Sequence, residues 1–289
     1  MDNNSIISTI NSLFGNLFSS IDSSLYSSLD NIAFIKTDIL NSYYFSKIFG
    51  SNSTSGFLLI ANSLLIGFVL YYSITYLLFS LNITQNPVQN PHQFFLKILI
   101  GGLLMNSSLF ICEGFISINS LLSESIRSLG KETLNVDICF SELIKQLNTV
   151  IFIEENYSNI FSIDGILKLV FSFSFFNIIF SYAIRYIMLK IFILISPIAF
   201  LTISNHNTSI FFKSWIKSFI ALLLVEILSS IILIIIFSIT YSSNDVTSKL
   251  LLIGASFALI KANSYVREFI GGISTDISDN MYLLRSFIK

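Results

Sequence analysis

The chain has 289 residues and a mass of 32.5 kDa, and 53% of its residues are hydrophobic against only 11% that are charged. A soluble domain carries about 25% charged residues, so composition excludes an ordinary soluble protein. Aromatic residues make up 15%, which excludes a disordered chain, and the net charge of −1 provides no general attraction for nucleic acid. We therefore expect an all-α, polytopic transmembrane helical bundle.

The N-terminal segment, residues 1–56, shows an apolar stripe at helical spacing. The opposite face is rich in Ser and Asn, so the pattern predicts an amphipathic helix. The helix either lies on the membrane surface or packs against protein, meaning a partner or the rest of this chain. Its first basic residue is Lys36, so anionic lipid would attract it only weakly, and no cleavable signal peptide is expected. The stripe consists of Ile6, Ile10, Leu13, Leu17, Ile21, Leu25, Leu29 and Ile32.

Residues 57–122 are predicted to hold the first two membrane spans. No charged residue occurs between Lys47 and Lys97, and the apolar run 57–81 is long enough to cross a hydrocarbon core of about 30 Å. A polar turn with two prolines follows, and the second span is expected at 94–122. Residues 123–164 are acid-rich with partly helical spacing, which predicts a partly helical outer loop.

Residues 165–273 are predicted to hold three further spans, followed by a short polar tail, 274–289. The stretch 165–204 has no polar turn, so we expect one long helix that is broken at Pro197; two spans there would raise the total from five to six. Trp215 lies between two lysines, a pattern typical of an anchor at the membrane interface.

Five spans place the chain termini on opposite sides of the membrane. The short loops and the tail on one side are the more basic, which predicts a cytoplasmic C-terminus and an extracytoplasmic N-terminus. The loop at 123–164 is then extracytoplasmic too. If 165–204 held two spans, the C-terminus would change sides.

Glu226 is the most informative candidate residue, because it lies near the middle of an apolar helix where a charge is costly. It is either a carboxylate on a transport pathway or a polar link between helices. Lys168, Arg185 and Lys190 are the candidate partners for such a link. Glu113 lies nearer a helix end, and we interpret it as a second polar link.

Gly254, Ala258 and Ala262 recur every four residues on the last predicted span and predict a face on which another helix packs closely. The sequence contains no recognisable catalytic or nucleotide-binding motif. Its two histidines and two cysteines are few and widely separated. No catalytic, cofactor or metal site is therefore expected, and the chain is not predicted to be an enzyme.

Three segments of the second half resemble a known family. They are the apolar run IFILISPIAFL at 191–201, the segment SIFFKSW at 209–215, and the stretch ANSYVREFIGG at 262–272. Together with the number of spans and the long loop, they are similar to the TrbL family of polytopic inner-membrane subunits of type IV secretion and conjugation machines.

This resemblance implies a structural channel component of the bacterial inner membrane. It would contact other membrane subunits and the energising ATPases in a homo- or hetero-oligomer. The substrate would be DNA or protein, without autonomous nucleic-acid binding by this subunit. The alternatives are a small-molecule or ion transporter or channel, which often carries paired broken helices, and a membrane-embedded enzyme, which is less favoured.

Overall fold

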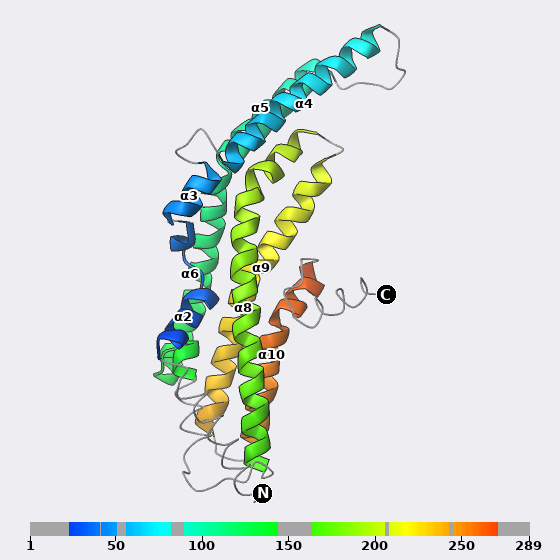
Figure 1. The fold of residues 1–289 in the computed structure, drawn as a ribbon. Coiled ribbons are helices and arrows are strands. Elements are labelled where there is room, and N and C mark those ends of the chain that lie inside the picture. Colours follow the sequence, from blue (N-terminus) through cyan, green and yellow to red (C-terminus); the bar gives the residue numbers. More distant parts are fainter. Residues whose placement is uncertain are drawn as a thin grey trace, which may run out of the picture. The chain divides into compact units, whose positions relative to one another are not determined.

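The computed structural model describes residues 23–40, 42–50, 56–81, 90–143, 163–205, 208–242 and 246–270. Over these ranges all the regular secondary structure is helical, which confirms the all-α prediction (Figure 1). Residues 1–22, residues 144–162 of the predicted loop and the tail 274–289 lie outside the described residues. The helices are α2 (Ser23–Ala33), η1 (Thr37–Leu40), α3 (Tyr43–Phe49), α4 (Phe57–Ser80), α5 (Pro91–Asn106), α6 (Ser108–Leu134), α8 (Ile163–Leu201), η2 (Thr202–Ser204), α9 (Ser209–Ser242) and α10 (Val246–Ile270).

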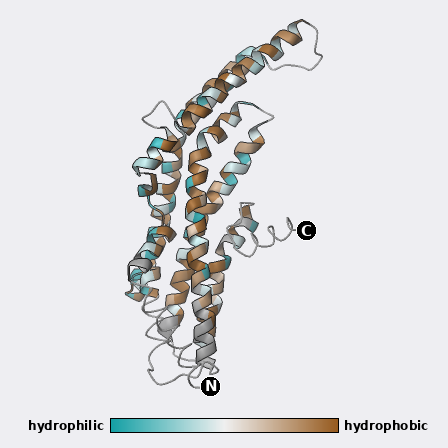
Figure 2. Cartoon of the chain, viewed as in Figure 1, coloured by the Kyte–Doolittle hydropathy of each residue, from teal (hydrophilic) through white to brown (hydrophobic). Residues whose placement is uncertain are grey.

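Four of the described helices are long and apolar enough to cross a membrane, so the protein is a multi-pass membrane protein. Apolar residues predominate along α4, α9 and the described side chains of α8 (Figure 2), whereas α6 also carries many polar ones. The fifth predicted span corresponds to α10, whose apolar stretch, Leu250–Ala262, is shorter than the other four. The four candidate spans are Phe57–Ser80, Ser108–Leu134, Phe176–Ser204 and Ser209–Ile239.

The second candidate span differs from the predicted one. Helix α5 ends at Asn106, and the candidate span is α6, which continues to Leu134 through residues that the sequence pattern assigned to a loop. The physical reason is visible in its polar residues: Ser123 is fully buried and bonded to another helix rather than exposed in a turn. Polar side chains that pair inside a bundle do not end a helix.

The prediction that Pro197 breaks its helix is wrong, because α8 continues through this residue to Leu201. Proline has no backbone N–H, so the carbonyl of Ile193 loses its normal helical donor. The hydroxyl of Ser196 donates to that carbonyl at 2.7 Å and replaces the missing bond. A neighbouring serine thus keeps the helix intact.

The chain forms two compact units. One unit, here called the core unit, contains residues 1–35, 119–186 and 221–289; the other, the hairpin unit, contains residues 36–118 and 187–220. In the hairpin unit, α4 pairs with α5, and the rings of Tyr72 and Phe94 stack between them.

Trp215 belongs to the interior of the hairpin unit, and its role as an anchor at the membrane interface stays a prediction. Its side chain is only 5% exposed, and its ring packs among Phe200, Phe212 and Phe219. Its indole N–H donates to the carbonyl of Phe192 at 3.0 Å. A buried indole needs such an acceptor, and the facing helix provides it.

The apolar centre of the core unit combines side chains of α2, α8, α9 and α10 with residues 138–143. Leu29 and Ala33 of α2 are buried in it, so the described end of the predicted N-terminal stripe packs against the chain's own bundle. The rest of the stripe, up to residue 22, lies outside the described residues. Of the two readings of this segment, the structure supports packing against protein for α2.

Gly130 allows α6 to approach its neighbours closely. A Cβ atom at this position would lie 2.7 Å from Cγ1 of Ile234 and 2.8 Å from Cγ1 of Ile138, both shorter than a van der Waals contact. Gly114, on the same helix, has no neighbouring atom within 4 Å of an added Cβ.

Gly130→Ala is therefore expected to destabilise the protein by about 1–3 kcal/mol through overpacking. Gly114→Ala is the matched control, and it should be neutral or stabilising because alanine is favoured over glycine in a helix by up to about 1 kcal/mol. Thermal unfolding of the two purified variants in detergent measures the difference. Equal melting temperatures would contradict the close approach at Gly130.

Candidate functional site

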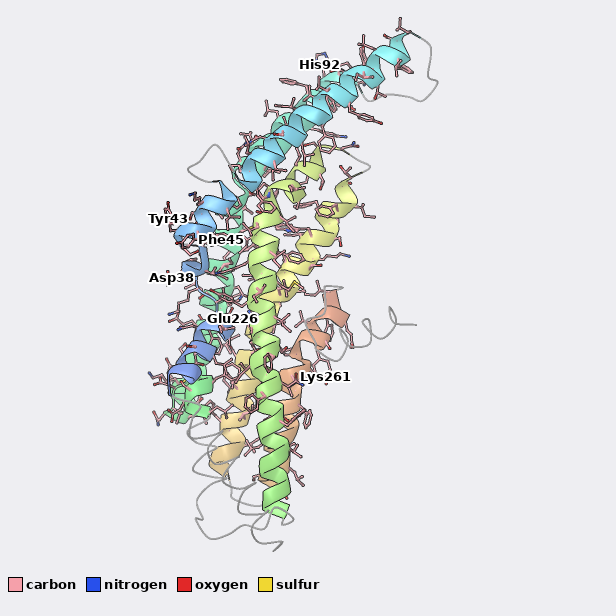
Figure 3. All side chains as sticks on the ribbon, viewed as in Figure 1. Asp38, Tyr43, Phe45, His92, Glu226 and Lys261 are labelled. Carbon is pink, nitrogen blue, oxygen red and sulfur yellow. The ribbon has the colours of Figure 1, made fainter. Side chains whose placement is uncertain are left out.

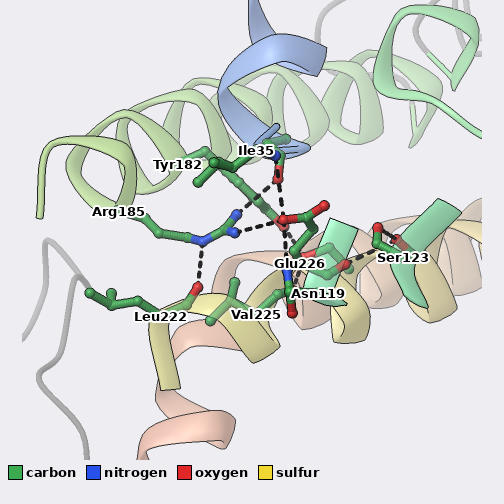
Figure 4. A network of polar contacts seen from close by, with 11 residues as sticks. Ile35, Asn119, Ser123, Tyr182, Arg185, Leu222, Val225 and Glu226 are labelled. Atoms are coloured by element: carbon green, nitrogen blue, oxygen red, sulfur yellow. Dashed lines mark hydrogen bonds and ion pairs between the residues drawn. The ribbon is translucent and has the colours of Figure 1, made fainter. Parts of the chain in front are cut away.

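Glu226 is the centre of a polar network inside the core unit (Figures 3 and 4). It is the only charged residue of α9 beyond Lys217, and its side chain is 1% exposed. A carboxylate so far from water requires positive or hydrogen-bonding partners. One of its oxygens, Oε2, receives all of the partners that the described residues provide.

Arg185 on α8 is the charged partner of Glu226. Its Nη2 lies 3.4 Å from Oε2 of Glu226, and the whole side chain is buried. The other two nitrogens of the guanidinium donate to backbone carbonyls. Nε donates to the carbonyl of Leu222 at 2.8 Å, and Nη1 donates to the carbonyl of Ala33 at 2.9 Å. The pair is thus electrically neutral, and the arginine reaches three partners from three directions.

Two further donors complete the carboxylate's contacts. The side-chain amide of Asn119 on α6 donates to Oε2 at 2.9 Å, and the backbone N–H of Ile35 donates to the same oxygen at 3.3 Å. The second oxygen, Oε1, is buried without a hydrogen-bond partner among the described residues. The network therefore joins α2, α6, α8 and α9 through a single oxygen atom.

The end of α2 depends on this ion pair. The helix ends at Ala33, where the amide of Phe34 still donates to the carbonyl of Asp30 at 2.8 Å. The carbonyl of Ala33 has no further helical turn to supply a donor. Arg185 donates to the Ala33 carbonyl, and Glu226 accepts from the Ile35 N–H, so the pair satisfies one backbone group on each side of Phe34. Buried backbone groups without partners are costly, so the pair stabilises this turn directly.

Hydroxyl groups extend the network along α9. Ser230 pairs with Ser123 on α6 at 2.8 Å and bonds to its own helix at the carbonyl of Glu226. Ser229 pairs with the hydroxyl of Tyr182 on α8. Helices α6 and α8 are therefore each bonded to α9 at two positions, once at Glu226 and once about a turn further along α9.

The segment around α2 has two more polar attachments. The guanidinium of Arg127 lies over the ring of Phe34 at 3.9 Å. The carboxylate of Asp30 accepts from the backbone N–H groups of Phe140, at 2.7 Å, and Ser141, at 3.1 Å, which begin a helix. An anion at a helix N-terminus is stabilised by the free amides there.

Nearby, burial raises the pKa of the Cys139 thiol above its ordinary value.

The other sequence candidates lie outside this network. Glu113 is exposed on α6, so it does not form the predicted buried link within this chain. Lys190 is half-buried in the hairpin unit, while the Lys168 side chain lies outside the described residues. Ala262 is fully buried and Ala258 is half-buried against the core, but Gly254 is exposed with open space beside it.

Sequence reasoning found the two charges but not their other partners. Arg185 was one of three candidate partners for Glu226, and the structure selects it. The chain contains many asparagines, and nothing in the sequence distinguishes Asn119 from the others. The groups at Ala33 and Ile35 belong to the backbone, so the residue types at these positions do not reveal their role. Only the fold brings them to one point.

The geometry suits fixed attachment rather than chemistry. The carboxylate and the guanidinium neutralise one another, and both are closed off from solvent. Within the described ranges, no group of three His, Cys, Asp or Glu residues is placed to hold a metal ion. The arrangement can hold helices in register.

Removing one partner of the pair should be more harmful than removing both. Glu226→Leu leaves the Arg185 guanidinium buried without its counter-charge, and we expect a loss of about 3–5 kcal/mol. The double variant Arg185→Met, Glu226→Leu removes the uncompensated charge and should recover part of that loss. Thermal unfolding of the purified variants in detergent measures both changes.

Glu113→Leu is the matched control, since it removes an exposed carboxylate from a candidate span and should change stability little. The single variant Arg185→Met completes the cycle. If the double variant lost as much stability as the two single variants added together, the side chains would not be coupled and the network would be incidental.

Comparisons with protein-family models, with characterised proteins and with solved structures find no match for this chain.

Proposed function

We propose that the protein is an integral membrane scaffold or channel subunit of a type IV secretion apparatus in the bacterial inner membrane, serving conjugative DNA transfer or protein transfer. The observation that carries the proposal is the use of its buried charges. Arg185 and Glu226 join helices and backbone to one another, as expected of a subunit whose task is to hold a fixed architecture.

The state of Glu226 favours this function over a pathway carboxylate. A carboxylate on a transport pathway has to meet water or moving substrate. Glu226 is 1% exposed, and Oε2 already has three partners. Its contacts would have to be broken before it met a substrate.

The type IV assignment rests on the resemblance to the TrbL family. Two of the similar segments, at 191–201 and 209–215, form the end of α8 and the beginning of α9 on either side of η2. Residues of the two segments contact each other, since the rings of Phe200 and Trp215 pack together. The similar segments thus lie on two helices that pack against one another.

A subunit of this kind needs partners, and the chain offers surfaces for them. Ala61 is the one buried residue of the candidate span α4, and Gly254 on α10 faces open space. Other membrane subunits, further copies of this chain and lipid are the proposed neighbours, with ATPases of the secretion complex on the cytoplasmic side. The net charge of −1 supports no autonomous binding of nucleic acid.

One observation favours the second candidate, a small-molecule or ion transporter. The backbone between α2 and η1 is not helical, and it lies beside the buried ion pair. Transporters commonly place an interrupted helix beside their polar binding site. A membrane-embedded enzyme has no comparable support in the described structure.

Deletion of the gene in a host that carries a conjugative or effector-secreting system tests the proposal. We expect loss of transfer of plasmid DNA or effector protein, restored by the native chain, and co-purification of the chain with a large membrane complex. Glu226→Gln should retain most of the transfer, because the amide oxygen still accepts from Asn119 and Ile35. Intact transfer after deletion, with a defect in solute uptake, would establish the transporter instead.

The proposed orientation places the end of α6 outside the cytoplasm. Glu132 is exposed near this end, so Glu132→Cys in a Cys112→Ser, Cys139→Ser background is a suitable reporter. An impermeant thiol reagent should label it in intact cells whose outer membrane has been permeabilised. Labelling only after the inner membrane is broken would reverse the orientation.

A further inference from the structure

The polar network lies at the middle of three candidate membrane spans. Glu226 is two residues from Leu224, the midpoint of Ser209–Ile239, and Asn119 is two residues from Leu121, the midpoint of Ser108–Leu134. At about 1.5 Å per residue each is within about 3 Å of its midpoint. Arg185 is five residues from the midpoint of Phe176–Ser204, or about 7.5 Å, which its long side chain can bridge.

The end of α2 must therefore lie at the same depth. The Ala33 carbonyl is 2.9 Å from Arg185, and the Ile35 amide is 3.3 Å from Glu226, so neither group can lie at the membrane surface while these contacts exist. Helix α2 is not among the candidate spans, because it is short and polar on one side. Hydropathy alone gives no sign of a membrane-embedded segment here.

The outer side of this turn is polar. Asn31 of α2 is exposed, and Lys36, one peptide bond after Ile35, is exposed as well. A charged side chain that faces lipid at the bilayer centre costs several kcal/mol. Non-helical backbone is tolerated at that depth only where it is buried in protein or lines a water-filled space.

We propose that the turn at residues 33–36 is embedded at the middle of the bilayer and that its exposed side, marked by Asn31 and Lys36, faces water inside the thickness of the membrane. The ion pair of Arg185 and Glu226 holds the inner side of the turn, and an aqueous space within the thickness of the membrane contacts the exposed side. The occupant of this space is water with small hydrophilic solutes. The inference goes beyond the proposed function, since it depends only on the depth of the network.

Accessibility of introduced cysteines tests the proposal in membranes that contain the complete protein. Asn31→Cys and Lys36→Cys, each in the Cys112→Ser, Cys139→Ser background, are treated with a small charged methanethiosulfonate and, separately, with a 5-kDa polyethylene glycol maleimide. We expect the small reagent to modify both positions at least about tenfold faster than a lipid-facing site. The large reagent should be excluded, because the space lies within the thickness of the membrane.

Two sites on α6 provide matched controls. Leu121→Cys, at the same depth and 63% exposed on an apolar surface, should resist both reagents. Glu132→Cys, exposed near the helix end, should react with both. Reaction of Asn31→Cys and Lys36→Cys with the large reagent would place the turn outside the membrane. Resistance to the small reagent would mean that lipid or another subunit covers it, and either result overturns the proposal.

Discussion

A single buried carboxylate oxygen, Oε2 of Glu226, connects the parts of the core unit. It accepts from Arg185 on α8, from Asn119 on α6 and from the backbone of Ile35 beyond α2. In an apolar interior such a group is stabilising only when its partners are all present, because the desolvation of a charge exceeds what any one contact returns. The helices that carry these partners are therefore fixed relative to one another by a polar requirement, while the apolar side chains around them tolerate many arrangements.

The same constraint explains why a short, weakly apolar helix can belong to a membrane bundle. Among the α2 side chains that the structure describes, Leu29 and Ala33 are the buried apolar ones, and two such residues would not by themselves draw the helix into a bilayer. The attachments at Asp30, Phe34 and Ile35 add specific partners in three directions. A segment held by such contacts can carry polar residues on the side that faces away from the bundle, whereas a helix that spans the membrane by its own hydrophobicity cannot.

The function that we propose follows from how the charges are used. A subunit that moves a substrate keeps some of its buried polar groups available, whereas Arg185 donates to two backbone carbonyls in addition to its counter-ion. An architectural role in a secretion complex is consistent with that arrangement. The interrupted backbone after α2 is a feature that transporters also have. Its depth in the membrane is compatible with a scaffold as well, because a scaffold that surrounds a transfer route also exposes some of its residues to water within the membrane.

The sequence by itself determined the membrane class, the all-helical architecture and the importance of Glu226, because apolar length and a charge at its centre are local properties of the chain. Its prediction of a helix break at Pro197 was wrong, and it gave no sign of the burial of Trp215 or of Ser123. Each of these depends on a neighbour: the hydroxyl of Ser196, the carbonyl of Phe192 and the helix facing Ser123. Only the tertiary structure decided that Arg185, rather than either lysine, meets Glu226, and that the pair holds the end of α2. Those partners are far apart in the chain or lie in its backbone, and hydrogen bonds to backbone groups leave no pattern in the side chains.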